Sequence, residues 1–99
     1  MAKRKSRLIV APFNASGYLD NREVIAEYLG AALEDPNTDV FLHAVADVAE
    51  ARGISKVAKD AGLGRKSLYK ALAPGANIRY DTVRKILDSL GVQLTVTTG

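Results

Sequence analysis

The side chains best suited to chemistry lie in one short segment, where cations and hydroxyl groups follow one another. Arg65, Lys66 and Lys70 are accompanied there by Ser67 and Tyr69. Guanidinium and ammonium groups bind phosphate oxygens and the acceptor edges of bases, and hydroxyl groups add hydrogen bonds to both. The segment therefore indicates recognition of a nucleic acid rather than a centre of reaction.

Other chemistries have few candidate residues. The chain has no cysteine and a single histidine, His43, which falls opposite the apolar stripe of its predicted helix and is expected to be exposed. No Ser/His/Asp set offers three plausible members, and the carboxylates are scattered rather than paired. The AGLG run, residues 61–64, indicates a turn and not a phosphate-binding loop. We expect no enzyme, metal site or cofactor.

Two short helices are predicted to position the cationic segment. Between Ile54 and Leu72 the sequence indicates a helix, a glycine turn and a second helix, the layout of a helix-turn-helix. Ala58 leaves room where the helices cross, and Gly62 accepts a left-handed backbone at little cost. The apolar side chains would then face the core: Val57, Ala61, Leu63, Leu68 and Leu72.

The starts of these two helices carry small residues. Ser55 is expected to cap the first helix through its hydroxyl, and Gly64 to begin the second. A helix that begins there presents Arg65, Lys66 and Lys70 outward, because Leu68 and its i+4 neighbour define the inward face. The cations would be free to meet a ligand.

Three further helices are expected around this pair. The first opens near Asp20, with Glu23 completing a capping box, and ends before Pro36. The second is capped by Asn37 or Thr38 and ends at Arg52 and Gly53, and the last spans about residues 80–90 after a loop at 73–78. Their predicted core residues are Val24, Ile25, Tyr28, Leu29, Ala32, Leu33, Phe41, Ala44, Val45, Val48, Ala49, Val83, Ile86, Leu87 and Leu90.

The last segment, Val92 to Thr97, alternates apolar and polar residues and predicts a strand with one buried face. A single strand leaves its backbone N–H and C=O groups unpaired. Its partner is either Arg7 to Ala11 of the same chain or the equivalent strand of a second subunit. We favour a homodimer, because one short recognition helix usually needs two half-sites to be specific.

Charge is sorted along the chain. Residues 1–12 form a basic arm, with four cations and no acid in the first seven residues, that can contribute a short strand. Residues 18–51 carry eight acids against Arg22 alone, whereas nine cations face three acids from Arg52 onward. The carboxyl-terminal half is therefore suited to phosphate. The acidic half is either a surface for a basic partner or ordinary solubilising charge.

The length of 99 residues predicts one domain, residues 13–99, following the basic arm. The longest apolar stretch is far shorter than a membrane span, and the apolar run after the basic residues, Leu8 to Ala11, is too short for a secretory signal. We expect a cytoplasmic protein that has no membrane partner.

Three runs of the sequence together resemble a known family. They are YLDNREVIAEYLGAALED, ARGISKVAKDAGLGRKSLYKAL and IRYDTVRKILDSLGVQL. Across about residues 13–96 the chain resembles the probable addiction module antidote family, the small HigA-like antitoxins of the Xre type. One departure is Gly64, where related sequences commonly carry serine, so one possible phosphate contact is lost.

The resemblance implies a mainly α, five-helix domain of the Xre and lambda-repressor-like class with a short carboxyl-terminal strand. It also implies the antitoxin of a type II toxin-antitoxin module, a homodimer that binds its own operator, represses transcription and neutralises a toxin, commonly a small basic ribonuclease. Two alternatives stay open. One is a toxin-independent phage- or plasmid-type repressor, and the other is an inhibitor that acts by occlusion with little DNA binding.

Geometry assigns the expected DNA contacts. The first residues of a recognition helix enter the major groove, so base edges fall to Arg65 and Lys66, and Lys70 reaches a base or a phosphate one turn later. The remaining contacts are to the groove wall and the DNA backbone, through Ser67, Tyr69, Ser55, Lys56, Asn77 and Arg79.

Overall fold

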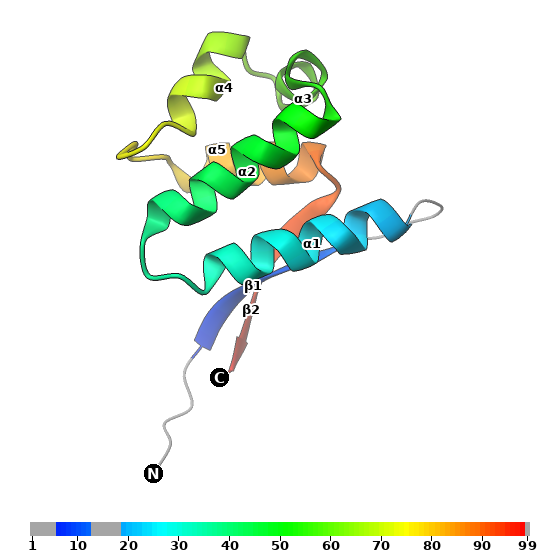
Figure 1. Ribbon diagram of the computed structural model, residues 1–99, viewed down its shortest axis with the longest axis vertical. Helices are drawn as coiled ribbons and strands as arrows, with labels where there is room; N and C mark the ends of the chain where they lie inside the picture. Colours follow the sequence, from blue (N-terminus) through cyan, green and yellow to red (C-terminus); the bar gives the residue numbers. More distant parts are fainter. Residues whose placement is uncertain (1–5, 13–18, 99) are drawn as a thin grey trace.

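The computed structural model describes residues 6–12 and 19–98, which hold five helices and two strands (Figure 1). In chain order these are β1 (Ser6–Pro12), α1 (Leu19–Leu33), α2 (Thr38–Arg52), α3 (Ile54–Ala61), α4 (Arg65–Ala71), α5 (Tyr80–Ser89) and β2 (Val92–Thr98). The expected helices are all present. Among these helices, none combines the length and the apolar character needed to cross a bilayer.

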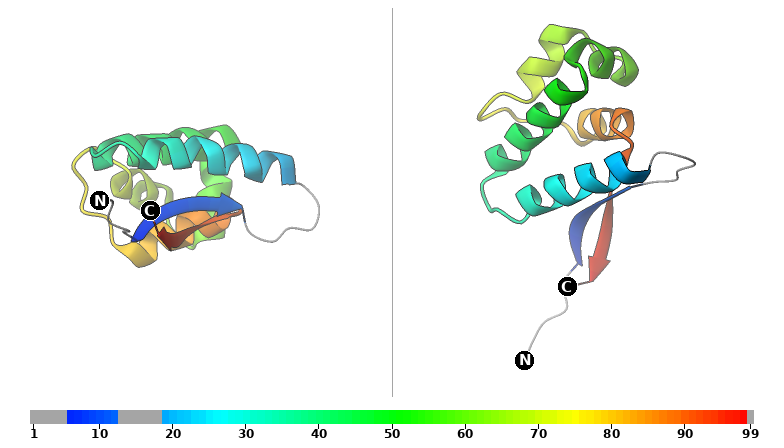
Figure 2. Two further views of the ribbon diagram at one scale, coloured as in Figure 1. Left: turned by 90° about the horizontal axis from the view of Figure 1, so that it is seen from below. Right: turned by 45° about the vertical axis from the view of Figure 1, so that its right-hand side comes forward.

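The carboxyl-terminal strand finds its partner within the chain. β1 and β2 pair antiparallel, in a register that runs from Ser6 opposite Thr98 to Pro12 opposite Val92. This is the first of the two predicted pairings, and it joins the two ends of the described chain in a ribbon beside α1 (Figure 2). Val10 and Val92 are buried where the ribbon meets the helices.

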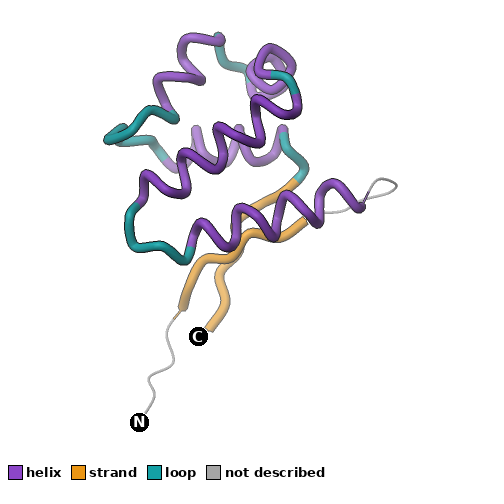
Figure 3. The backbone as a smooth tube through the Cα atoms, in the orientation of Figure 1, coloured by secondary structure: helices purple, strands orange, loops and turns teal. Residues whose placement is uncertain are grey.

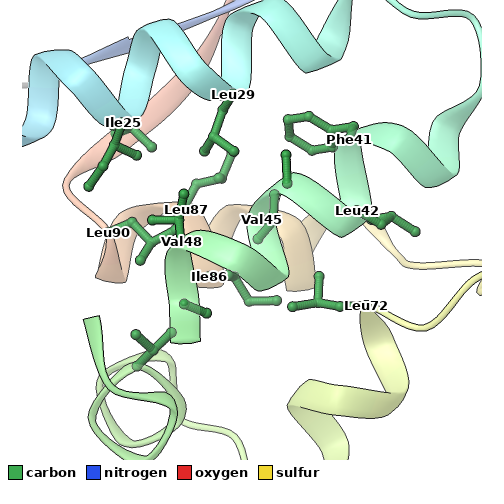
Figure 4. Close-up of a cluster of buried hydrophobic side chains, with 14 of the residues drawn as sticks. Ile25, Leu29, Phe41, Leu42, Val45, Val48, Leu72, Ile86, Leu87 and Leu90 are labelled. Carbon is green, nitrogen blue, oxygen red and sulfur yellow. The ribbon is translucent and has the colours of Figure 1, made fainter. Parts of the chain in front are cut away.

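A continuous core joins all five helices to this ribbon. α2 lies between α1 and the pair α3 and α4, with α5 behind it (Figure 3). Side chains from α1, α2 and α5 and from Leu72, just after α4, pack against one another in this core (Figure 4). Burying each aliphatic side chain of this size contributes about 1.5–3 kcal/mol. The large residues that are essentially fully buried are Leu29, Leu42, Leu68, Ile86, Leu87, Leu90 and Val92.

The ends of α2 follow the sequence signals closely. The Asn37 side-chain oxygen accepts a hydrogen bond of 2.9 Å from the backbone N–H of Asp39, which confirms Asn37 as the cap. At the other end Gly53 has a positive φ of 103° and closes the helix. The predicted inward stripe of α2 is buried: Phe41, Ala44, Val45, Val48 and Ala49.

The prediction for α1 was wrong at two positions. Val24 and Tyr28 were expected in the core, yet they are 64% and 47% exposed. The apolar stripe of α1 is wider than the surface that α2 and β1 cover, so its outer edge is left open. The Tyr28 hydroxyl instead donates a hydrogen bond of 3.0 Å to Asp47 on α2, whereas Ile25 and Leu29 are buried and Leu33 is half-buried.

The strand prediction also needs one correction. The alternation of β2 placed Val96 on the buried face, but this residue is 63% exposed, because that end of the ribbon extends past the helices (Figure 2). The basic residues Lys3, Arg4 and Lys5 lie outside the described residues. The Asp20 side chain, the expected partner of Glu23 in a capping box, also lies outside the described side chains.

Candidate nucleic-acid interface

The cationic segment forms α4 at the end of the molecule that is farthest from the sheet (Figure 1). Leu68 is fully buried in this helix, and Leu72, which follows it, is buried as well. These two anchors fix the rotation of α4 about its axis, because residues four apart share one helix face. The five predicted contact residues of the helix are all exposed: Arg65, Lys66, Ser67, Tyr69 and Lys70.

The turn before α4 sets the direction in which this helix leaves α3. Gly62 adopts a left-handed conformation with φ of 73° and ψ of 29°, as predicted. The Leu63 N–H donates a 2.8 Å hydrogen bond to the Ala58 carbonyl, which closes the end of α3 in the manner of a Schellman turn. Gly64 then begins α4 in an extended conformation, without a side-chain cap.

The packing of α3 on neighbouring helices holds this turn in place. Val57, Ala58 and Ala61 are buried on one face of the helix, which packs on α5 and α2. Small residues at two of these three positions let the helices approach closely. The turn and the exposed face of α4 are therefore held by a packed core and not by a loop.

Four of the predicted contact residues line one groove. Ser67 and Lys70 of α4 lie across from Asn77 and Arg79, which belong to the loop before α5. The groove is open to solvent and holds about 560 Å³. Residues seven to twelve positions apart in the sequence are thus brought to one surface, and the half-buried side chains of Ala76 and Ile78 anchor the loop that carries Asn77 and Arg79.

The sequence prediction missed one polar member of this groove. Thr82, in the first turn of α5, lines it beside Arg79. No local signal marks this threonine, because it is one of several polar residues near the start of a helix. Only the packing of α5 beneath the loop places it there.

The cations of this surface differ in their ionic partners. Lys56 lies 3.3 Å from an Asp60 oxygen, and Arg79 lies 3.5 Å from an Asp81 oxygen. Such exposed pairs are weak and exchange readily for another anion. Within the described residues, no carboxylate lies within 4.0 Å of Arg65, Lys66 or Lys70. These three side chains are therefore available to an external anion without first leaving a carboxylate partner.

The capping role predicted for Ser55 was wrong. α3 begins at Ile54, and Gly53 is at once the last cap of α2 and the first cap of α3, without a side-chain hydrogen bond. Gly53 is the single residue between α2 and α3, so Ser55 lies inside the first turn of α3. Its side chain is exposed beside Lys56, outside the groove formed by Ser67, Lys70, Asn77 and Arg79.

The structure defines a small, mainly helical protein with a two-stranded sheet and one exposed cationic helix. A family model described as a probable addiction module antidote protein matches residues 9–98. The chain belongs to this family, whose antidote role implies a cognate toxin as a partner.

A relative identified by sequence adds to this comparison. The chain is similar to a protein of Haemophilus influenzae (strain ATCC 51907 / DSM 11121 / KW20 / Rd) that is described as an uncharacterized protein. The two are 38% identical over 84 residues, which cover 85% of this chain and 87% of the relative. No solved structure shows a significant match to the chain.

Proposed function

We propose that this chain is the antitoxin of a type II module, of the HigA-like Xre type, that binds its own operator and represses transcription. α3 and α4 act in this proposal as a helix-turn-helix. The observation that carries it is the orientation of α4, which buries Leu68 and Leu72 and leaves Arg65, Lys66 and Lys70 exposed. A helix with this distribution suits the major groove, which is wide enough for one α-helix.

In this proposal the exposed residues of α4 make different kinds of contact with DNA. Arg65 and Lys66 open the helix and contact base edges, where arginine reads guanine through two hydrogen bonds. Lys70 follows one turn later and reaches a base or a phosphate. Ser67 and Tyr69 form hydrogen bonds at the wall of the groove.

Residues on either side of α4 hold the DNA backbone. Asn77 and Arg79 share a groove with Ser67 and Lys70, so they can clamp the strand that passes beside the helix. Ser55 and Lys56 lie in the first turn of α3, where the helix dipole favours an anion. A phosphate would replace Asp60 as the partner of Lys56.

The protein acts as a homodimer in this proposal. Leu8 and Val96 lie directly opposite each other in the ribbon, and they are 48% and 63% exposed. A cross-strand apolar pair on an open ribbon is a surface that a second copy can cover. Two copies would present two α4 helices to half-sites about one turn of DNA apart, roughly 34 Å.

The toxin in this proposal is a small basic ribonuclease of the cytoplasm. The acids of α1 and α2 support it, because their charge complements that of a protein that binds RNA. DNA binding and toxin neutralisation would then use opposite charges on different helices.

Binding titrations with the DNA upstream of the gene and with random DNA, each at several salt concentrations, test the DNA contacts. Arg65→Ala should lower the preference for the upstream DNA by about 5- to 150-fold, because a bidentate base contact is worth about 1–3 kcal/mol. Lys56→Ala should weaken binding to both DNAs to the same extent. It should also reduce the slope of log affinity against log salt concentration by about one. Unchanged affinity of both variants for both DNAs would refute these assignments.

A further inference from the structure

An apolar groove runs between α1 and α2 and adjoins the cationic groove at Pro74, which lines both. It holds about 570 Å³ and is bounded at one end by the loop after α4. Most of its lining is apolar, and besides the Tyr28 hydroxyl its only polar side-chain groups are those of Asp39 and His43. The apolar lining consists of Tyr28, Ala31, Ala32, Val40, Ala44 and Pro74.

Large apolar side chains remain uncovered along this groove. Tyr28 and Val40 are both exposed, one from each helix, and Val24 is exposed one turn before Tyr28. Scattered apolar residues are ordinary on a protein surface, but a contiguous group within a groove is typical of a site where another molecule docks. Tyrosine in particular is enriched among residues that dominate binding energy.

Carboxylates surround the same groove. Asp47 accepts the hydrogen bond of the Tyr28 hydroxyl at 3.0 Å, and its Oδ2 lies 3.4 Å from Nδ1 of His43. Asp39 lines the groove itself, and Glu34 and Asp35 are exposed in the connection between the two helices. Arg22 is the sole cation between residues 19 and 51.

We propose that this groove is the docking surface for the cognate toxin, which inserts an apolar side chain between Tyr28 and Val40. Cations of the toxin flank that side chain and meet the surrounding carboxylates. This inference rests on the proposed function as an antitoxin, and it assigns the toxin surface to α1 and α2, next to the DNA surface on α4.

Charge rules out the two other ready occupants. DNA would bring phosphates against the carboxylates. A second copy of the chain, related by a twofold axis at the groove, would place the same acidic patch against itself, because a twofold interface is self-complementary. A basic protein meets neither obstacle.

The first step of the test is to identify a toxin-like reading frame that abuts this gene. Isothermal titration calorimetry of its product against this chain then tests the proposal. Tyr28→Ala should weaken binding by about tenfold or more, the effect of removing an aromatic anchor. Tyr80→Ala is the control, because Tyr80 is also exposed, at 61% against 47% for Tyr28, but lies on α5 outside the groove, and it should leave the affinity unchanged.

A pair of variants at one position tests the charge. Ala31 is exposed and lines the groove, and both Arg and Glu are good helix formers there. Ala31→Arg should bind the toxin about tenfold or more weaker than Ala31→Glu, and the difference should shrink at high salt. Thermal unfolding and binding to the upstream DNA, which should match wild type, show that each variant is folded.

The possible outcomes distinguish the two proposals. Loss of binding in Tyr28→Ala and Ala31→Arg, with Tyr80→Ala unchanged, supports the groove. If wild type binds this protein and the groove variants bind equally well, the groove is not the docking surface, although the antitoxin function stands. If wild type itself does not bind, toxin neutralisation by this chain is wrong, and the groove proposal falls with it.

Discussion

The carboxylate of Asp39, in the first turn of α2, accepts a 2.8 Å hydrogen bond from the backbone N–H of Gly75, which lies 36 residues further along the chain. Gly75 has a positive φ of 79° and belongs to the loop that carries Asn77 toward the cationic groove. The contact therefore ties the loop on the proposed DNA surface to the first turn of α2.

Removal of this contact should loosen the loop. Asp39→Ala should lower the free energy of unfolding by about 1 kcal/mol, the usual net value of one hydrogen bond, while Asp39→Asn, which keeps an acceptor oxygen, should lose less. Urea denaturation followed by circular dichroism measures both. Equal stability of wild type and Asp39→Ala would show that the contact does not hold the loop.

Replacing each of two glycines by alanine should change the stability of the protein in opposite directions. Gly30 lies inside α1 and Gly62 ends α3 with φ of 73°, and a Cβ atom would meet no neighbour within 4 Å at either position. Gly30→Ala should stabilise the protein by about 0.5–1 kcal/mol because alanine loses less backbone entropy in a helix. Gly62→Ala should destabilise it by about 1–2 kcal/mol because of the left-handed backbone.

Melting temperatures of the two alanine variants, compared with that of wild type, check these signs. A stabilising effect at position 62 would mean that the turn before α4 is not left-handed. Since the turn aims α4, Gly62→Ala should also weaken DNA binding, whereas Gly30→Ala should not.

The hydrogen bond between Tyr28 and Asp47 should be visible in the titration of tyrosine. The Asp47 carboxylate raises the pKa of Tyr28 above 10.0, first through the hydrogen bond, with burial and charge repulsion adding to it. The raised value means that this contact stabilises the fold below pH 10 and that the stabilisation is lost as the pH rises through the pKa of the folded protein.

Ultraviolet absorbance of tyrosinate follows this titration. In Asp47→Ala the pKa of Tyr28 should fall toward 10.0, and Tyr28→Phe identifies which transition belongs to this residue. An identical titration curve for wild type and Asp47→Ala would exclude the hydrogen bond in solution.

Substitution of Val96 should separate the proposed dimer. Val96→Glu places a charge in the exposed apolar pair of the ribbon and should convert a dimer into a monomer without unfolding it, since Val96 is largely exposed. Val24→Glu is the matched control, with a similarly exposed valine on α1. Analytical ultracentrifugation distinguishes the two states, and a dimer that persists in Val96→Glu places the interface elsewhere.

Helix positions could be predicted from the sequence because their signals are local. Asn37, Gly53 and Gly62 each mark a helix end through the properties of a single residue, and the structure confirms all three in these roles. The outward face of α4 follows from Leu68 and Leu72 alone.

Other features depend on contacts that no local pattern contains. The partner of β2 is β1, at the opposite end of the chain, so the sequence left two pairings open. The exposure of Tyr28 depends on how far α2 overlaps α1. Ser55 does not cap α3, because Gly53 is the cap residue of both α2 and α3. Thr82 lines the cationic groove only because of the way α5 packs.

Fluorescence anisotropy with the DNA upstream of the gene would show whether α4 contacts the operator. The triple variant Arg65→Ala, Lys66→Ala and Lys70→Ala should bind this DNA about a hundredfold or more weaker than wild type, because base and phosphate contacts are lost together. Arg84→Ala with Lys85→Ala, which removes two exposed cations of α5, should stay within about threefold of wild type. An α4 variant that binds as tightly as wild type, or a control that loses as much, would contradict recognition through α4.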